Sequence, residues 1–282
     1  MKSVVVTGAS TGIGWGSAKV LIEKGFRVFG SVRKEADAQR LSREFGANFT
    51  PLIFDVTDAT AIRTAADKVQ ATLGGTALSG LVNNAGIAVA GPLLYIDPDE
   101  VRRQIEVNVM GQLLVTQAFA PLLAAEGKEK AGRIVMISSV GGRNASPFMG
   151  PYNASKFAIE GLSESLRREL MLLGIDVIVV APGAVATPIW DKAEEIDIAR
   201  YDNTPYAKAL AGVRDYMLVN GRKGFPPERI GRAVWQALTA KNPRPRYTVT
   251  PDPFQNFLMT TLPKRMVDRL IARKLGWGQK KA

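Results

Sequence analysis

The chain has 282 residues, of which 46% are hydrophobic, and it contains no histidine and no cysteine. The missing residue types exclude Ser-His-Asp and Cys-His nucleophilic catalysis, Cys/His zinc sites, iron–sulfur ligation and disulfide bonds. Asp and Glu do not cluster at a metal-ligand spacing either, so we expect no bound metal. The net charge is +11, and residues 241–282 carry most of it, with ten Lys and Arg against two Asp.

The N-terminal segment MKSVVVTGAS enters an apolar run directly and lacks the length and cleavage pattern of a signal peptide. No stretch reaches the roughly 18 uninterrupted apolar residues that would suggest a membrane span. The sequence therefore predicts a cytoplasmic protein, and the absence of disulfides agrees with a reducing compartment.

Short apolar runs alternate along the chain with longer amphipathic segments, which is typical of a parallel sheet covered by helices on both faces. The pattern predicts strands at residues 3–7, 27–31, 48–53, 79–83, 133–138, 175–181 and 246–249. It predicts helices at residues 13–24, 36–45, 59–73, 98–125, 152–173, 205–219 and 226–240, with N-caps at Asp58 and Asp97. We expect one doubly wound α/β domain over residues 1–250, with an insertion at 189–224 and a basic extension at 251–282.

The sequence TGASTGIG at residues 7–14 follows the first predicted strand and opens the first helix. Gly8 permits a tight turn, Gly12 lets the backbone approach a pyrophosphate, and Gly14 lets helix and strand pack closely. The free N–H groups at the start of the helix would bind phosphate. A turn without a ligand is the alternative, but its position between strand and helix favours dinucleotide binding. The other members of the predicted loop are Ser10, Thr11 and Ile13.

Tyr152 and Lys156 are four residues apart in the sequence YNASK, so on a helix they share one face. A free tyrosine has a pKa of about 10, and lowering it to near neutrality requires about 4 kcal/mol of preferential stabilisation of the phenolate. The charge of Lys156 favours the phenolate, and the hydroxyl of Ser139 could bind a substrate oxygen. Alone, Tyr152 could be a packed aromatic residue and Ser139 a turn residue; together they predict a proton-transfer site.

These motifs, with NNAG at residues 83–86, Asn108 and PGAVAT at residues 182–187, resemble the short-chain dehydrogenase/reductase family in order and spacing. The sequence is similar to its single-domain, shorter-chain branch, and ASKFAIEGLSESLRREL resembles the hydroxysteroid and retinol dehydrogenase members. The resemblance implies a Rossmann-type domain and NAD(P)-dependent interconversion of a secondary alcohol and a ketone or aldehyde.

The same resemblance implies roles for individual residues. Tyr152 would be the general acid/base, Ser139 the substrate-oxygen stabiliser, Lys156 the residue that lowers the tyrosine pKa and binds the ribose, and Asn108 the anchor of a relay water. Further cofactor contacts would be Asp55, Val56, Asn83, Ala85, Gly86, Pro182, Gly183, Val185 and Thr187. Asp55 could instead only cap a turn, and the Asn pair could be a turn alone.

The residues after the second strand indicate which dinucleotide binds. NAD sites usually place Asp or Glu here to hold the ribose hydroxyls, but the chain reads Gly-Ser-Val-Arg-Lys and has no carboxylate before Glu35. Arg33 can present a guanidinium fork to a phosphate, and Ser31 can add a hydrogen bond. The sequence therefore predicts NADP(H) as the preferred cofactor, with NAD(H) possible. Thr11 does not fit the predicted preference for NADP(H), since many NADP-preferring members of the family have a basic residue at that position.

Aromatic and methionine side chains gather in the insertion and just before the catalytic tyrosine. They are Pro147, Phe148, Met149, Trp190, Tyr201, Tyr206, Tyr216 and Met217. Loops at the carboxyl ends of parallel strands bind ligands in open α/β sheets, so these residues suggest a lipophilic, steroid-like or retinoid-like substrate. The alternative is that they fill a small core of the insertion itself.

The extension places Leu262, Met266 and Leu270 on one helical row, with Val267 and Ile271 beside them and basic residues around. Such a helix could contact an anionic membrane or dock on its own or another subunit. Basic residues without clustered base-stacking aromatic residues give little support for nucleic-acid binding, so we expect none. We expect a homodimer or homotetramer acting on a small molecule. Alternatives to oxidoreduction are an isomerase or dehydratase on the same scaffold and a non-catalytic NADP sensor.

Overall fold

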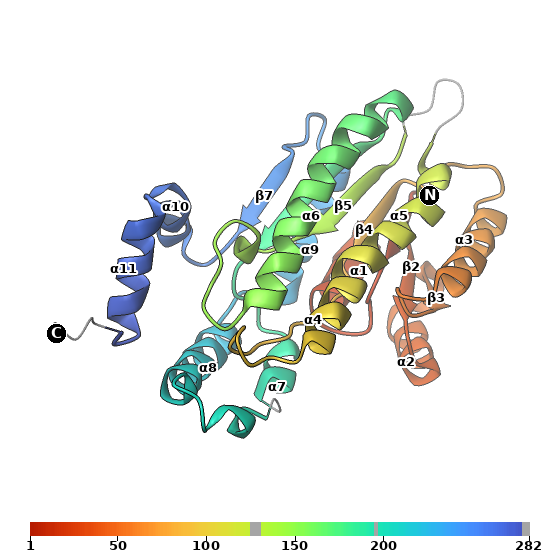
Figure 1. Cartoon of the computed structure of the whole chain (residues 1–282). Helices are drawn as coiled ribbons and strands as arrows, with labels where there is room; N and C mark the ends of the chain where they lie inside the picture. The colour runs from red at the N-terminus through yellow and green to blue at the C-terminus, as the bar shows by residue number, and fades with distance from the viewer. Residues whose placement is uncertain (125–130, 195–196, 278–282) are drawn as a thin grey trace, which may run out of the picture.

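The computed structural model describes residues 1–124, 131–194 and 197–277. Its centre is a parallel sheet of seven strands in the order β3-β2-β1-β4-β5-β6-β7 (Figure 1). The strands are β1 (Ser3–Val6), β2 (Arg27–Val32), β3 (Phe49–Ile53), β4 (Gly80–Asn83), β5 (Arg133–Ile137), β6 (Asp176–Pro182) and β7 (Arg246–Val249). All seven predicted strands are confirmed, each to within one residue. The strand order reverses between β1 and β4, and open α/β sheets bind ligands at the carboxyl ends beside such a point.

Two helical layers cover the sheet. One face packs against α1 (Gly12–Glu23), α2 (Glu35–Phe45) and α9 (Pro227–Thr239), and the other against α3 (Ala59–Leu73), α5 (Gly111–Leu123) and α6 (Gly150–Glu169). Side chains of β1 alternate between the layers, because Val4 and Val6 join the α1 side while Val5 joins the α5 side. Burial on both faces explains the near-continuous apolar strands.

The predicted helix at residues 98–125 is divided in the structure, and residue 125 lies outside the described residues. It consists of α4 (Pro98–Ile105), a π-helical turn at Glu106–Met110, and α5. Gly111 lets α5 approach the loop after β3, since a Cβ there would lie 2.7 Å from Val56 Cγ2. Both predicted caps are present: Asp58 accepts hydrogen bonds from Thr60 N and Ala61 N, and Asp97 accepts one from Asp99 N.

The insertion contains α7 (Ile189–Glu194), a 3₁₀ turn at Ala199–Tyr201 and α8 (Ala207–Arg222). Its two ends are joined, because Val185 pairs with Phe225 and Ala186 N donates to Phe225 O at 2.9 Å. The insertion therefore leaves and rejoins the rest of the chain at neighbouring points. With α4, its helices lie at one end of the sheet (Figure 1).

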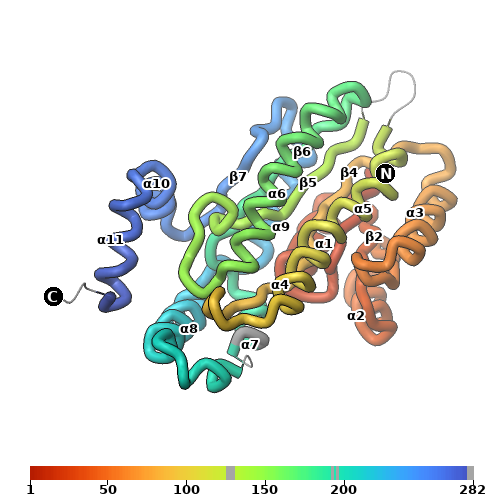
Figure 2. The backbone as a smooth tube through the Cα atoms, viewed as in Figure 1, coloured from red at the N-terminus to blue at the C-terminus, as the bar shows by residue number. Residues whose placement is uncertain are grey.

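The C-terminal extension forms two helices, α10 (Pro253–Thr261) and α11 (Lys264–Lys274), which project beside β7 (Figure 2). The prediction of one helical row through Leu262 is wrong, because α10 ends before Leu262 and Pro263 precedes α11. The extension docks on its own chain: Val267 is buried, and the Trp277 ring lies 5.9 Å from that of Phe148. None of the described helices is both long and apolar enough to cross a lipid bilayer.

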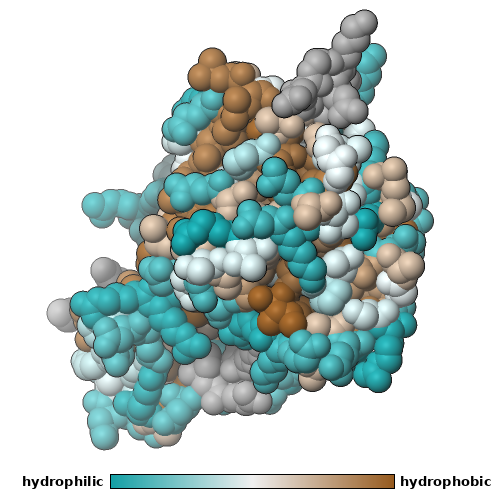
Figure 3. All heavy atoms as spheres, turned by 90° about the vertical axis from the view of Figure 1, so that its right-hand side faces the viewer, coloured by the Kyte–Doolittle hydropathy of each residue, from teal (hydrophilic) through white to brown (hydrophobic). Residues whose placement is uncertain are grey.

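The face that carries α2 and α3 is mostly hydrophilic, with apolar side chains in separate patches (Figure 3). Such a face is typical of solvent-exposed surface. The cleft described below opens elsewhere, at the carboxyl ends of the strands.

Candidate active site

The loops that follow the strands enclose one large cleft of about 1880 Å³. Ordinary ligand pockets measure roughly 300–1,000 Å³, so this cleft has room for a dinucleotide and a second molecule. The predicted site residues that line it are Gly8, Ser10, Thr11, Gly12, Ile13, Ser31, Arg33, Asp55, Val56, Ala85, Gly86, Ser139, Tyr152, Lys156, Pro182, Gly183, Val185 and Thr187. Gly14, Asn83 and Asn108 were also predicted and do not line it.

The glycine turn forms a cradle that only glycine permits. Gly8 and Gly12 have φ angles of +65° and +59°, which are rare for other residues. A Cβ on Gly14 would lie 2.1 Å from Gly8 O, and one on Gly12 would lie 3.2 Å from Thr187 Cγ2. The turn therefore brings backbone N–H groups at the start of α1 to the cleft surface, where they suit a pyrophosphate.

A residue that the sequence analysis missed joins this turn to β4. Asn84 Nδ2 donates to Thr7 O at 2.8 Å, and Asn84 N donates to Thr7 Oγ1 at 2.9 Å. Asn83, by contrast, is fully buried and donates to Thr116 Oγ1 on α5 at 2.8 Å. Its prediction as a cofactor contact is wrong for the side chain, because the strand pleat turns Asn83 into the core and Asn84 to the cleft.

The end of β2 carries the residues predicted to select the dinucleotide. Arg33 is mostly exposed, and its Nη1 lies 3.8 Å from Asp55 Oδ2. Burial raises the pKa of Asp55, but hydrogen bonds from Thr57 and the charge of Arg33 lower it overall, so the carboxylate is ionised at neutral pH. Ser31 is buried, and its hydroxyl accepts a hydrogen bond from Gly8 N at 3.0 Å, which connects the glycine turn to β2.

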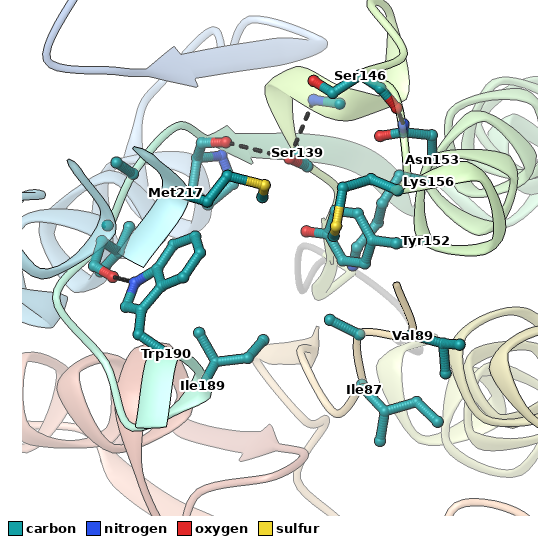
Figure 4. A pocket seen from close by; sticks show the side chains of 18 of the residues that line it. Ile87, Val89, Ser139, Ser146, Tyr152, Asn153, Lys156, Ile189, Trp190 and Met217 are labelled. Atoms are coloured by element: carbon teal, nitrogen blue, oxygen red, sulfur yellow. Dashed lines mark hydrogen bonds between the residues drawn. The ribbon is translucent and has the colours of Figure 1, made fainter. Parts of the chain in front are cut away.

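Ser139, Tyr152 and Lys156 meet at the centre of the cleft (Figure 4). Ser139 follows β5, and its hydroxyl accepts a hydrogen bond from Gly141 N at 3.0 Å. Tyr152 and Lys156 lie on the first turns of α6, with Lys156 Nζ 5.7 Å from the centre of the Tyr152 ring. Lys156 is 5% exposed and donates to Ile137 O at 2.8 Å, which fixes the ammonium at the end of β5.

The electrostatics of these groups differ from the prediction. Burial raises the pKa of Tyr152, and the hydrogen bond with the Ser139 hydroxyl opposes this shift without cancelling it. Burial also lowers the pKa of Lys156 to about 8, against the opposing charge of Glu160. The expectation that Lys156 by itself acidifies Tyr152 is therefore wrong for the chain alone, because the ammonium is directed to a backbone carbonyl and desolvation dominates.

Asn108 lies in the π-helical turn between α4 and α5 and is fully buried. Its amide accepts a hydrogen bond from Ile87 N at 2.8 Å and donates to Ile87 O at 3.0 Å and Ser155 Oγ at 3.1 Å. Ser155 Oγ in turn donates to Tyr152 O at 2.7 Å. Both amide hydrogens are therefore engaged, and the side chain connects the loop after β4 to the catalytic helix. π-turns of this kind occur frequently at functional sites.

The insertion supplies the opposite wall. In Figure 4, Met217, Trp190 and Ile189 lie across the cleft from Tyr152. Trp190 Nε1 donates to Val185 O at 2.7 Å, and its ring packs on Gly221 of α8, where a Cβ would come within 2.2 Å. The aromatic and methionine residues divide between the two expected roles. Trp190, Tyr216 and Met217 line the cleft, whereas Phe148, Tyr201 and Tyr206 belong to a separate small core.

The extension completes the outer wall. Its cleft-lining residues are Asp252, Gln255, Asn256, Met259, Ile271, Lys274, Leu275, Gly276 and Trp277. Lys274 Nζ lies 4.0 Å from the Tyr216 ring centre, a cation–π contact between α11 and α8. Among the described residues, no three Cys, His, Asp or Glu side chains are grouped to hold a metal ion.

Comparison with known proteins agrees with this geometry. The family model for short chain dehydrogenase matches residues 2–197. An NADPH-dependent 3-dehydrocapnine reductase of Ornithobacterium rhinotracheale is 37% identical over 277 residues, which are 98% of each chain. Human retinol dehydrogenase 5 is 32% identical, over 95% of this chain and 87% of its own. The crystal structure of a short-chain dehydrogenase from Streptomyces avermitilis superposes with a TM-score of 0.76 at 28% identity, over 98% of this chain and 95% of its own.

The doubly wound sheet, the glycine cradle and the matches define a nicotinamide-dependent oxidoreductase. The chain belongs to the short-chain dehydrogenase/reductase family. It is an NAD(P)-dependent enzyme that interconverts alcohols and ketones.

Proposed function

We propose that the protein uses NADPH to reduce the ketone of a lipophilic substrate to a secondary alcohol. The observation that carries the proposal is the meeting of Ser139, Tyr152 and Lys156 beside the glycine cradle in one cleft. The bound cofactor would supply the hydride. The NADPH dependence of the 3-dehydrocapnine reductase supports the same cofactor here, and so does Arg33 in place of a carboxylate.

We assign each side chain a step that its position suits. The Ser139 hydroxyl holds the substrate carbonyl oxygen, and the Tyr152 hydroxyl gives that oxygen its proton as hydride reaches the carbon. Burial raises the pKa of Tyr152, so at neutral pH the phenol carries the proton that ketone reduction requires. Lys156, protonated below its pKa of about 8, then stabilises the phenolate that remains.

A lipophilic substrate is supported by the wall opposite Tyr152. Retinol, named for one relative, is a lipophilic alcohol. Apolar side chains from three segments face the same cleft: Met149, Val213, Met217, Ile271, Leu275 and Trp277. Burial of apolar surface stabilises a bound ligand by about 25 cal/mol per Å². We propose that residues 1–250 form the catalytic domain and that the described part of the extension, residues 251–277, closes its substrate side.

Replacing Tyr152 by phenylalanine tests the catalytic assignment. Turnover should be lost, while NADPH titration by fluorescence should give an affinity close to that of the unchanged protein. Full activity of Tyr152→Phe would refute it. The substrate class is tested by comparing kcat/KM for NADPH-driven reduction of retinoid, steroid, long-chain aliphatic and short polar ketones or aldehydes. A clear preference for the short polar compounds would contradict the lipophilic assignment.

We also propose that the extension contacts an anionic membrane in a cytoplasmic enzyme. Phe254 and Phe257 of α10 are 70% and 60% exposed, and Met266 and Leu270 of α11 are half exposed. The cations of α11 are Lys264, Arg265, Arg269 and Arg273. A segment that carries both exposed apolar groups and basic ones suits an anionic bilayer surface. Sedimentation with phosphatidylserine vesicles should fall on Phe254→Ser and Phe257→Ser substitution, and equal sedimentation would refute the contact.

We propose a homo-oligomer that uses α5 and α6. Two large apolar side chains are exposed there, Met110 just before α5 at 40% and Phe157 of α6 at 45%. Covering them would remove apolar surface from water. Light scattering after size exclusion should give a mass of two or four chains, and a monomer at micromolar concentration would contradict this.

A further inference from the structure

A mostly buried ion pair lies directly behind Ser139, and neither partner lines the cleft. Glu160 on α6 and Arg246 on β7 keep only 15% and 13% of their side-chain surface exposed. Arg246 Nε lies 3.2 Å from Glu160 Oε1 and 3.1 Å from Oε2. Taking two charges out of water is costly unless they are well paired, and here a single carboxylate receives the arginine at close range.

The pair connects three segments around Ser139. Arg246 Nη2 donates to the Ser139 carbonyl oxygen at 3.4 Å, and its Nη1 donates to Thr248 Oγ1. Glu160 Oε2 also lies 3.6 Å from Nε of Arg143, which follows the turn after Ser139. The backbone of Ser139 is thus held from β7, while the chain just beyond it is held from α6.

The turn after Ser139 also packs directly on the catalytic helix. A Cβ on Gly142 would lie 3.0 Å from Lys156 O and 3.1 Å from Glu160 Cγ. Glu160 therefore touches the same turn that carries Ser139, one helical turn beyond Lys156. The Glu160 side chain therefore contacts both the turn after Ser139 and Arg246.

We propose that Glu160 and Arg246 are positioning residues that clamp the backbone of Ser139 between α6 and β7, so that its hydroxyl faces Tyr152. The inference rests on the roles proposed above for Ser139 and Tyr152. A displacement of about 1 Å at a reacting group can cost about 100-fold in rate. Loss of the clamp therefore lowers kcat and leaves the distant nucleotide cradle intact.

Glu160 has a second effect through its charge. Burial lowers the pKa of Lys156 to about 8, and the negative charge of Glu160 opposes this. Among the described residues, the titratable side chains facing Lys156 are Tyr152 and Glu160 on its own helix. Glu160 itself faces Arg143 from the loop after β5 and Arg246 from β7. Neutralising Glu160 lowers the pKa of Lys156 further, whereas an Arg246→Lys change conserves the charge at position 246.

The test compares Glu160→Gln and Arg246→Lys with the unchanged protein in NADPH-dependent ketone reduction. Both substitutions should lower kcat about 10- to 100-fold and leave the KM for NADPH within about twofold. Glu160→Gln should also move the alkaline limb of the kcat profile to lower pH, because Lys156 loses its proton earlier. Arg246→Lys should lower kcat without moving that limb, a difference that a merely structural role would not produce.

A control distant from the cleft is the more exposed ion pair at the amino ends of β5 and β6, where Arg133 Nε lies 3.3 Å from Asp176 Oδ2. Asp176→Asn should leave kcat unchanged. Unchanged kcat in Glu160→Gln and Arg246→Lys would overturn the clamp even if Tyr152→Phe is inactive, whereas an active Tyr152→Phe would overturn the proposed function itself. Parallel losses of kcat, NADPH affinity and Tm would also overturn the clamp, since they indicate general unfolding.

Discussion

Replacing Lys156 by methionine should stabilise the folded chain at neutral pH while abolishing turnover. Lys156 is 5% exposed, and burial lowers its pKa from 10.5 to about 8. A shift of that size corresponds to about 3 kcal/mol of unfavourable folding free energy at pH 7. Methionine removes this cost, but it also leaves Ile137 O without its hydrogen-bond donor. The loss of that hydrogen bond lowers the gain in unfolding free energy by about 1–2 kcal/mol. The expected net gain in unfolding free energy is about 1–2 kcal/mol.

The pH dependence separates the buried charge from the lost hydrogen bond. The pKa of Lys156 is lower in the folded chain than in the unfolded chain, so the cost is complete below about pH 8 and disappears as the pH rises to 10.5. At pH 9.5 about 1 kcal/mol of it remains. The advantage of Lys156→Met over the unchanged protein should therefore shrink by about 2 kcal/mol between pH 7 and pH 9.5.

The assay is urea unfolding at pH 7, 8.5 and 9.5, followed by circular dichroism at one protein concentration without cofactor. Lys68→Met on the exposed side of α3 is the control, and its difference from the unchanged protein should not vary with pH. The reasoning would be refuted if the difference in unfolding free energy between Lys156→Met and the unchanged protein were the same at all three pH values. It would mean that Lys156 is not held as a buried ammonium.

Three further substitutions test other parts of the cleft. Arg33→Asp should reduce the preference for NADPH over NADH in kcat/KM about 10- to 100-fold, since a charge-assisted phosphate contact contributes roughly 1.5–3 kcal/mol. An unchanged ratio would show that Arg33 does not bind the phosphate. Gly14→Ala should abolish nucleotide binding by calorimetry, because its Cβ would lie 2.1 Å from Gly8 O; normal affinity would contradict the cradle. Trp277→Ala should raise KM for long lipophilic ketones severalfold through loss of the Phe148 contact but leave short ketones unchanged; equal effects on both would exclude Trp277 from the substrate wall.

The sheet could be predicted from the sequence because its signals are local. Each strand is an apolar run between turn residues. The spacing of Gly8, Gly12 and Gly14 predicts the tight turn between the first strand and the first helix. The choice between Asn83 and Asn84 could not be predicted as securely, since a shift of one residue along a strand exchanges core and cleft. Only the register at the end of β4 decides it.

Other features depend on contacts between residues distant in the chain. In the chain alone, burial raises the pKa of Tyr152. The 3.6-residue period places Lys156 on the same helical face as Tyr152, but it reveals neither this burial nor the hydrogen bond from the Lys156 ammonium to Ile137 O. Glu160 and Arg246 are 86 residues apart, and no local pattern relates them. The prediction of a single helical row through Leu262 was wrong although the sequence itself indicated the break, because Pro263 disfavours helix at the residue before it.

The two halves of the cleft differ in how firmly they are held, and this has a measurable consequence. The nucleotide side is built on strands whose apolar residues are almost all buried, whereas within the described part of α10 and α11 only Val267 is buried. Segments with few buried apolar contacts open at lower free energy than the core. We therefore expect amide hydrogens of α11 to exchange much faster than those of α6, so that a lipophilic substrate can enter without disturbing Tyr152. Equal protection of α11 and α6 would contradict this, and entry would then need another route.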